Sequence, residues 1–359
     1  MKILLRYLNR LASTNRAVFC VLGGIAAMLV ATEADAQITF TIQADTAHRQ
    51  VEVYANGQPV TSYRYPSRIK KPILYPLRTP AGTVMTRGFP LDARPNERVD
   101  HPHHVGLWFN YGNVNGYDFW NNSEAADPDG KYGTVHHRDI VQITEGEQAR
   151  LEVTADWITS DDDLVLEEST NFVFSAWNED TYLIDRITTL TAVNGEVSLA
   201  DNKEGLLGLR VARMLEHPSE EPAVLTDASG QPTEPAVRHN EGVNGRYRSS
   251  EGVAGTDVWG TRARWMQLSG RVDELPSSIV VLDHPANVGF PTYWHARGYG
   301  LFAANPLGQQ ALSGGKEVLN FRLKDGESVT FRYRIALHAG EPLSDQAVER
   351  LYEAFSEDQ

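Results

Sequence analysis

The sequence predicts a mostly β protein, built as a large antiparallel β-sandwich with one C-terminal helix. Three observations predict this class: many short segments that alternate apolar and polar residues, turn residues between them, and a single segment of helical period near the end. Short strands at regular spacing with one late helix are typical of two packed sheets.

The predicted strands begin close to the start of the folded part of the chain. Residues 38–44 and 50–65 come first, and Asn56-Gly57 inside the second stretch predicts a tight hairpin turn. Further strands are expected at 149–159, 163–177, 181–193, 277–284, 300–306, 317–323 and 328–338.

One helix is expected near the C-terminus. Val348, Leu351 and Phe355 recur at intervals of three and four residues, and Ser344 and Asp345 suit a helix start. We expect this helix to pack its apolar side against the sandwich.

Residues 1–36 have the features of an export signal. Basic residues precede an apolar stretch at 17–31, and Ala34-Asp35-Ala36 supplies a small-x-small cleavage site. We expect the mature chain to begin near Gln37 and to be periplasmic or secreted; an uncleaved anchor is the alternative. The single cysteine, Cys20, lies in this leader, so a mature domain has no thiol nucleophile and no cysteine–zinc cluster.

Residues 37–359 are expected to form a single β-sandwich domain. The range near 216–255 is rich in Pro, Gly, Ser and charged residues, which indicates a long insertion, with a linker between two domains as the competing interpretation. The formal net charge of −14 argues against nucleic acid or an anionic membrane as a partner. We expect a small-molecule or oligosaccharide substrate instead, and no membrane contact after signal cleavage.

The stretch DHPHHVGLWFNYGNVNGYDFW, at residues 100–120, is the main candidate for chemistry. It holds three of the eleven histidines within four positions. If the backbone is extended there, His101 and His103 point to one side and His104 to the other. Asp100 could orient one imidazole for proton transfer. The alternatives are a metal site with His101, His103 and His295 as ligands, or histidines that are only structural.

Aromatic and amide side chains alternate in the same stretch. Flat apolar rings beside hydrogen-bonding groups suit a sugar, whose C–H faces stack on aromatics and whose hydroxyls need donors and acceptors. The candidate sugar-binding residues here are Asp100, Trp108, Asn113, Asn115, Asp118 and Trp120. The alternative is an aromatic core with turn-forming residues between its strands.

Three later stretches offer the rest of a site. Glu204 is the best candidate for a second carboxylate, His295 is a further acid–base candidate, and Arg262 or Arg264 could clamp a carboxylate or sulfate. The remaining candidate binding residues are Lys203, Arg210, Trp259, Arg297 and Asn305. A phosphate-binding glycine loop, a Gly-x-Ser-x-Gly elbow and a His-Glu-x-x-His motif are absent, so we expect no cofactor, with a divalent metal as the alternative.

Five stretches resemble a known family: residues 71–82, 100–120, 203–213, 257–265 and 294–308. They are similar to the bacterial family labelled "methane oxygenase PmoA", also catalogued as a domain of unknown function. The label implies a copper oxygenase. The resemblance also implies a β-supersandwich similar to galactose mutarotase and to the carbohydrate-processing enzymes of that architecture.

These observations predict an exported carbohydrate-active protein that performs acid–base chemistry on a sugar. His101, His103, His104, Glu204 and His295 are the expected catalytic residues, and the reaction would cleave a glycosidic bond or epimerise a centre. Two alternatives stay open: a metal-dependent enzyme or oxygenase, and a carbohydrate-binding protein without catalysis.

Overall fold

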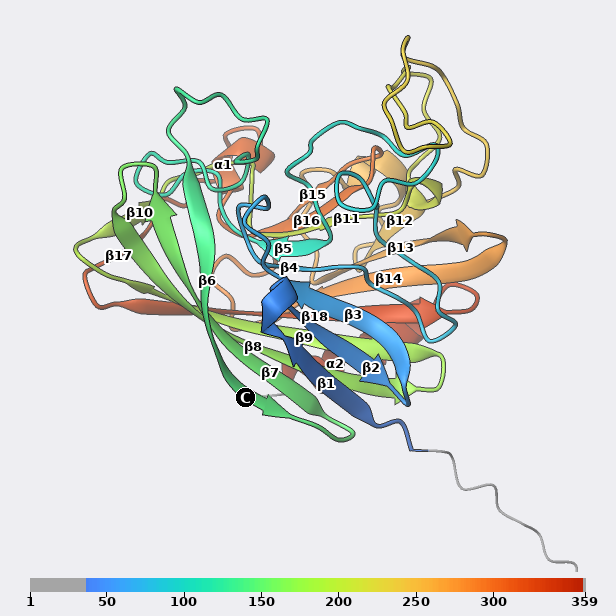
Figure 1. Ribbon diagram of the computed structural model, residues 1–359, viewed down its shortest axis with the longest axis horizontal. Coiled ribbons are helices and arrows are strands. Elements are labelled where there is room, and N and C mark those ends of the chain that lie inside the picture. Colours follow the sequence, from blue (N-terminus) through green and yellow to red (C-terminus); the bar gives the residue numbers. More distant parts are fainter. Residues whose placement is uncertain (1–36, 358–359) are drawn as a thin grey trace, which may run out of the picture. The chain divides into compact units, whose positions relative to one another are not determined.

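A computed structural model describes residues 37–357. Its strands form two eight-stranded sheets and one two-stranded sheet, and all the strand pairs within them are antiparallel (Figure 1). The predicted fold class, a mostly β antiparallel sandwich with a C-terminal helix, is therefore confirmed. The leader predicted for residues 1–36 lies outside the described residues.

The first sheet joins N-terminal strands to strands from the second half of the chain. Its order is β1 (Phe40–Asp45), β2 (Gln50–Ala55), β3 (Gln58–Arg64), β4 (Ile73–Leu74), β5 (Leu107–Phe109), β11 (Leu207–Arg210), β16 (Leu301–Asn305) and β15 (Tyr293–Ala296). The pairing of β5 with β11 brings residues about a hundred positions apart side by side. Asn56 and Gly57, between β2 and β3, both have positive φ, 47° and 78°, as the predicted hairpin turn requires.

The second sheet is formed mainly by long strands. Its order is β12 (Arg246–Ser249), β13 (Trp265–Val272), β14 (Leu275–Asp283), β18 (Ser328–Ala339), β9 (Thr181–Ala192), β8 (Leu164–Asn178), β7 (Ala149–Thr159) and β6 (Gly133–Thr144). The small sheet pairs β10 (Val197–Leu199) with β17 (Phe321–Leu323), and α1 (Gln309–Leu312) is a single helical turn. Short 3-10 turns occur at Thr46–His48, Arg213–Leu215 and Gly255–Val258.

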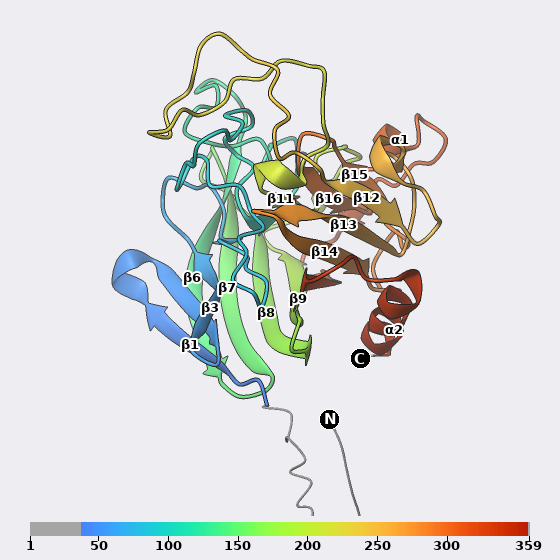
Figure 2. The same cartoon turned by 90° about the vertical axis from the view of Figure 1, so that its right-hand side faces the viewer.

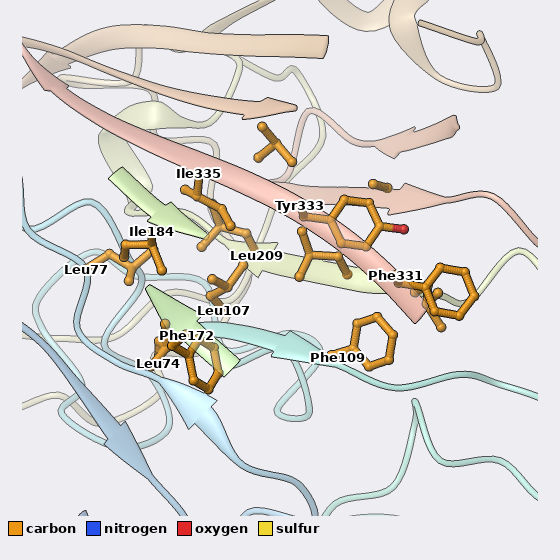
Figure 3. Close-up of a cluster of buried hydrophobic side chains, with 14 of the residues drawn as sticks. Leu74, Leu77, Leu107, Phe109, Phe172, Ile184, Leu209, Phe331, Tyr333 and Ile335 are labelled. Atoms are coloured by element: carbon orange, nitrogen blue, oxygen red, sulfur yellow. The ribbon is translucent and has the colours of Figure 1, made fainter. Parts of the chain in front are cut away.

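The main core lies between the two large sheets. Figure 3 shows Leu107, Phe109 and Leu209 of the first sheet near Phe172 and Ile335 of the second. These side chains are at most 2% exposed. Because alternate residues of a strand point to opposite sides, their sequence neighbours on β5 and β11 face away from this core.

The predicted helix is present as α2 (Asp345–Ser356), which lies beside the second sheet (Figure 2). Val348, Leu351 and Phe355 are buried and form a separate cluster with Trp265, on the sheet face opposite the main core. The Ser344 hydroxyl accepts a hydrogen bond from Ala347 N at 3.3 Å, so the predicted cap is also present.

The range predicted as an insertion, 216–255, contains little regular structure before its end. Isolated bridges link Ala223 with Val237 and Thr226 with Pro232, and β12 then joins the second sheet by pairing with β13. Within residues 37–357, no helix has the length and apolar character needed to cross a membrane.

Candidate functional site

The outer face of the first sheet, turned away from the main core, carries most of the predicted site residues. On β5 and β11, Leu107 and Leu209 enter the core, so Trp108, Gly208 and Arg210 face outward. Trp108 belongs instead to a second apolar cluster on this face.

The neighbouring strands extend the same face. Trp294 of β15 and Phe302 of β16 enter the core, so His295, Ala303 and Asn305 face outward. The outer face of four adjacent strands therefore brings together residues that lie almost 200 positions apart in the sequence.

One row of paired residues crosses these strands. Trp108 pairs with Gly208, Gly208 with Ala303, and Ala303 with His295. Three strand spacings put the backbones of Trp108 and His295 about 14 Å apart. The two middle residues are small, which leaves room on this face for the indole of Trp108: a Cβ added at Gly208 would lie 2.4 Å from its ring.

The histidine loop before β5 differs from the prediction. His101 has a positive φ of 45°, and His104 N donates to His101 O at 2.9 Å, so residues 101–104 form a turn. The expectation of an extended backbone, with His104 opposite His101 and His103, is wrong. The turn gathers all three rings, with centroid distances of 4.3 to 5.6 Å.

Four rings form a stack on the outer face. The order is Trp108, His104, His101 and Tyr299, with successive centroids 5.2, 4.8 and 4.9 Å apart and interplanar angles of at most 20°. Tyr299 was missed in the sequence analysis, although it lies in the WHARGYG stretch that drew attention to His295. The stack fixes the plane of the His101 ring.

The two predicted tryptophan platforms are both buried. Trp108 and Trp120 are 0% exposed, so neither presents a ring to a sugar. Trp120 Nε1 donates to His104 Nε2 at 3.2 Å, which makes that nitrogen an acceptor. Burial lowers the pKa of His104 well below its usual range. His104 is therefore a neutral, buried ring that supports the stack rather than a residue open to substrate.

Asp100 is anchored by two buried arginines. Its Oδ1 accepts from Arg87 Nη1 at 3.0 Å and from Arg210 Nη2 at 2.6 Å, while its Oδ2 lies 3.5 Å from His101 Nδ1. Burial alone would raise the pKa of Asp100, but His101 and the two guanidinium groups outweigh burial and hold it well below its usual range. Asp100 is thus a permanent carboxylate that orients His101. The sequence did not point to Arg87, because its contact with Asp100 depends on how the loop folds and not on a recognisable motif.

A second histidine–carboxylate pair lies at the β15 end of the face. His295 Nδ1 donates to Lys203 O at 2.9 Å and lies 3.8 Å from Glu204 Oε2, while Lys203 Nζ is 2.8 Å from Glu204 Oε1. Burial lowers the pKa of His295, and the Glu204 charge partly opposes this change. Among the described residues, His295 Nε2 has no hydrogen-bond partner and is not an enclosed atom, so the neutral ring presents a free acceptor.

Arg297, two residues beyond His295, lies against two aromatic rings. Its Cζ is 5.6 Å from the Trp259 ring and 5.8 Å from the Tyr299 ring. Trp259 is 39% exposed, in contrast to Trp108 and Trp120. Burial raises the pKa of Tyr299 to about 12, and the charges of both Glu204 and Asp100 contribute to the rise. Tyr299 therefore stacks on His101 and lies within electrostatic reach of both carboxylates.

Other predicted binding residues serve turns. Asn113 Oδ1 accepts from Gly116 N at 3.0 Å, and Asn115, with a φ of 53°, accepts from Ser198 N at 2.8 Å. Asp118 accepts from the backbone of Trp120 and Asn121, both at 2.9 Å. These three side chains are committed to backbone groups, and we find no site role for Asn113 or Asn115.

Asn305 is a positioning residue. It is 0% exposed, and its Nδ2 donates to Asn202 O and Lys203 O, both at 2.9 Å. It therefore fixes the loop that carries Glu204. Arg262 and Arg264 are already paired with carboxylates of the chain, Glu317 and Glu349 respectively.

His103 lies beside a buried lysine that the sequence analysis missed. Lys71 is 2% exposed, its Nζ donates to His103 O at 2.7 Å, and it lies 5.3 Å from the Trp108 ring. Burial lowers the pKa of Lys71 to about 7. Burial, and then the Lys71 charge, lowers the pKa of His103 to about 2, so the ring is neutral. In the sequence, the basic residues at 68, 70 and 71 were the signal that could have pointed to Lys71.

Residues 37–357 contain no group of three or more His, Cys, Asp and Glu side chains arranged to hold one metal ion. The three imidazoles of the loop stack on one another and on other rings instead of converging on a point.

The fold and this face define the class: an antiparallel β-sandwich protein with two histidine–carboxylate pairs on the outer face of one sheet. The chain belongs to the family described as "Family of unknown function (DUF6807)", which matches residues 50–353. The resemblance to the methane oxygenase PmoA family is therefore wrong, and the copper oxygenase that it implied has no support. No curated protein matches the chain.

Several solved structures are similar to the chain. They include a galactose 1-epimerase from Lactobacillus acidophilus NCFM, at 10% identity over 84% of this chain and 99% of that chain, with a TM-score of 0.31. A GalM/aldose epimerase homologue from C. elegans has 10% identity over 85% and 100%, with a TM-score of 0.27. A glycoside hydrolase family 97 enzyme from Pseudoalteromonas sp. strain K8, in complex with panose, has 10% identity over 86% and 35%, with a TM-score of 0.29. Because these TM-scores are low, we base the function on the geometry of the site alone.

Proposed function

We propose that the protein is an enzyme that exchanges protons with a sugar on the outer face of the first sheet, and that its product is an epimer at the anomeric centre. The observation that carries the proposal is the presence of two histidines on one face, each beside a carboxylate. His295 lies by Glu204 and His101 by Asp100, and both carboxylates act on Tyr299.

His295 is the proposed base. A carbonyl can only accept, so the bond to Lys203 O places the ring proton on Nδ1 and leaves Nε2 with its lone pair. The lowered pKa keeps the ring neutral near pH 7. The Glu204 charge would stabilise the imidazolium formed when Nε2 takes a proton.

His101 is the proposed acid. Its side chain is 39% exposed, whereas its Nδ1 is enclosed and faces Asp100. The carboxylate of Asp100 faces Nδ1, and in the proposed step His101 acts in its doubly protonated form. Nε2 can then give a proton to the ring oxygen of a sugar while His295 removes the proton of the anomeric hydroxyl, which opens the ring. Closure from the other face of the carbonyl returns both protons and gives the other anomer.

The state of Asp100 excludes one of the two carboxyl groups of this face as the acid of a glycosidic hydrolysis. Glycosidases generally need one carboxyl group that is protonated at the working pH. Asp100 is held ionised by Arg87 and Arg210, so it cannot supply that proton. The exposed ring of Trp259 offers a stacking surface for the sugar, and Arg297 beside it offers donors for hydroxyl groups.

The test is the mutarotation of freshly dissolved α-D-glucose and α-D-galactose, followed by polarimetry, with the purified mature protein. We expect a rate above the buffer rate that falls by about 100-fold or more in His295→Gln and Glu204→Gln, the usual range for a lost acid or base. His48→Gln is the matched control, because His48 is exposed and pairs only with Asp45.

Two results would overturn the proposal. A protein that binds sugars but returns them with unaltered anomerisation rates is a binding protein. Activity that chelation abolishes and a divalent metal restores would favour the metal-dependent alternative.

The leader predicted over residues 1–36 would place the activity outside the cytoplasm.

A further inference from the structure

A second pocket lies beside the histidine loop, apart from the Glu204–His295 pair. It has a volume of about 240 Å³, and its polar lining includes Arg68, Lys70, Lys71 and His103. It shares no lining residue with the region of Glu204, His295, Trp259 and Arg297. We refer to it as the Lys71 pocket.

The charge of this pocket differs in sign from that of the whole protein. Three of its lining residues are cationic, and one, the exposed Glu124, is acidic. The complete chain has a formal net charge of −14. A cationic hollow on an acidic protein favours a negatively charged ligand, because it attracts that ligand locally while the remaining surface repels it.

Lys71 gives the pocket a cation without a counter-charge. It is 2% exposed, its Nζ bonds to the carbonyl of His103, and among the described residues it makes no ion pair. Asp118 is the carboxylate whose charge acts on it, but Asp118 is committed to the backbone of Trp120 and Asn121. Burial without a paired anion lowers the pKa of Lys71 to about 7, so an anion bound beside it would favour the charged form.

Other features of the pocket point to the kind of anion. His103 lines the pocket, and its Nε2 atom is enclosed and has no hydrogen-bond partner among the described residues. Pro90, Pro102 and Val105 add an apolar wall. The volume is below the roughly 300 Å³ at which pockets for drug-sized ligands begin, so one sugar unit is the size that fits.

We propose that the Lys71 pocket binds a carboxylate carried on a single sugar ring, that is, a sugar acid. Lys71, Arg68 and Lys70 supply the cations for the carboxylate, and the proline wall contacts the C–H face of the ring. The choice of a sugar acid over another carboxylate rests on the proposed function, whereas anion binding at this pocket does not.

The experiment is calorimetric titration of the full mature protein with D-glucuronate, D-glucose and acetate. Glucose has the same ring without the charge, and acetate has the charge without the ring. We expect glucuronate to bind at least about tenfold more tightly than either, since a hydrogen bond to a charged group contributes about 1.5–3 kcal/mol. Equal binding of glucuronate and glucose would overturn anion recognition, and acetate binding as tight as glucuronate would overturn the sugar acid.

Two variants locate the binding. Lys71→Met removes the buried charge and keeps a long apolar stem, and the double variant Arg68→Gln, Lys70→Gln changes only the rim, so it stays informative if Lys71→Met fails to fold. Each should weaken glucuronate binding about tenfold. Lys316→Gln is the matched control, because Lys316 is exposed and lies outside the pocket.

The two proposals fail separately. Glu204→Gln should lower the mutarotation rate by about 100-fold and leave glucuronate affinity unchanged. Glucuronate binding that persists at full strength in both pocket variants would contradict the Lys71 pocket, whatever the outcome of the mutarotation assay.

Discussion

Glu204 Oε2 lies 3.8 Å from His295 Nδ1, yet that nitrogen donates its hydrogen bond to Lys203 O, at 2.9 Å. The carboxylate therefore acts on the imidazole through its charge, and the carbonyl fixes the tautomer. This division of roles leaves Nε2 as the atom that can meet a substrate.

The first prediction concerns pH. The Glu204 charge opposes the fall in the pKa of His295 that burial causes. Glu204→Gln removes this charge, so the pKa of His295 should fall further, and the acid limb of the rate profile should move to lower pH. A weaker base should also lower the plateau rate. Mutarotation rates measured from pH 4 to 8 check both effects. An acid limb that does not move would show that the Glu204 charge does not act on the pKa of His295.

The second prediction concerns the anchor of Asp100. Asp100→Asn removes the carboxylate that pairs with Arg87 and Arg210, both at most 1% exposed, and leaves Arg210 with Glu216 at 3.8 Å. Breaking a buried pair in this way should cost about 3–5 kcal/mol in the free energy of unfolding. Asp92→Asn is the control, since its pair with Arg64 is exposed and should be worth at most about 1 kcal/mol. Urea denaturation at pH 7 measures both.

The same carboxylate predicts a change of stability with acid. The folded pKa of Asp100 is lowered, so its stabilising contribution is present above the unfolded pKa of about 3.9 and is lost as the pH falls below it. The wild-type protein should lose stability between about pH 4 and 2, and Asp100→Asn should lose less over this interval. Parallel losses in the two proteins would contradict the assigned ionisation of Asp100.

The fourth prediction contrasts two tryptophans. Trp120 is buried and bonds to His104, so Trp120→Ala should destabilise the protein by about 3–5 kcal/mol. Trp259 is 39% exposed, so Trp259→Ala should change stability by no more than about 0.5 kcal/mol. Sugar affinity should fall in Trp259→Ala. A Trp259 variant with unchanged affinity would remove this ring from the proposed binding surface.

The fifth prediction concerns loop positioning. Asn305→Ala leaves the carbonyls of Asn202 and Lys203 without their donor. The loss should cost about 1–3 kcal/mol of stability. Because Glu204 follows directly, we also expect a lower mutarotation rate with its pH profile altered in the same direction as in Glu204→Gln. A variant that loses stability but keeps the wild-type profile would show that Asn305 does not position the carboxylate.

Local sequence patterns predicted the elements that depend on local chemistry. The alternation in 149–159 matches β7, and the spacing of Val348, Leu351 and Phe355 matches α2, because both patterns follow from which side of the element is buried. Of the strand predicted at 317–323, only the short β17, Phe321–Leu323, is present.

The site was less predictable, for physical reasons. The positive φ of His101 turned an expected strand start into a turn, and no residue type there signals it, since Pro102 suits either conformation. The alternation of aromatic and amide residues marked Trp108 as a candidate sugar-binding ring, but it could not show that His104 and Trp120 pack against that ring. The ion pairs of Asp100 join residues 13 and 110 positions away, which only the assembled sheet brings together.

Gly208 links sheet and site in a way that constrains how the chain can vary. A methyl group there would meet the rings of Trp108 at 2.4 Å and Trp120 at 2.8 Å, and these two indoles hold His104 and, through it, His101. An alanine at position 208 would therefore push the indoles against the imidazoles unless a smaller ring replaced one of them. Among relatives of this chain, position 208 and the tryptophan positions should change together or not at all.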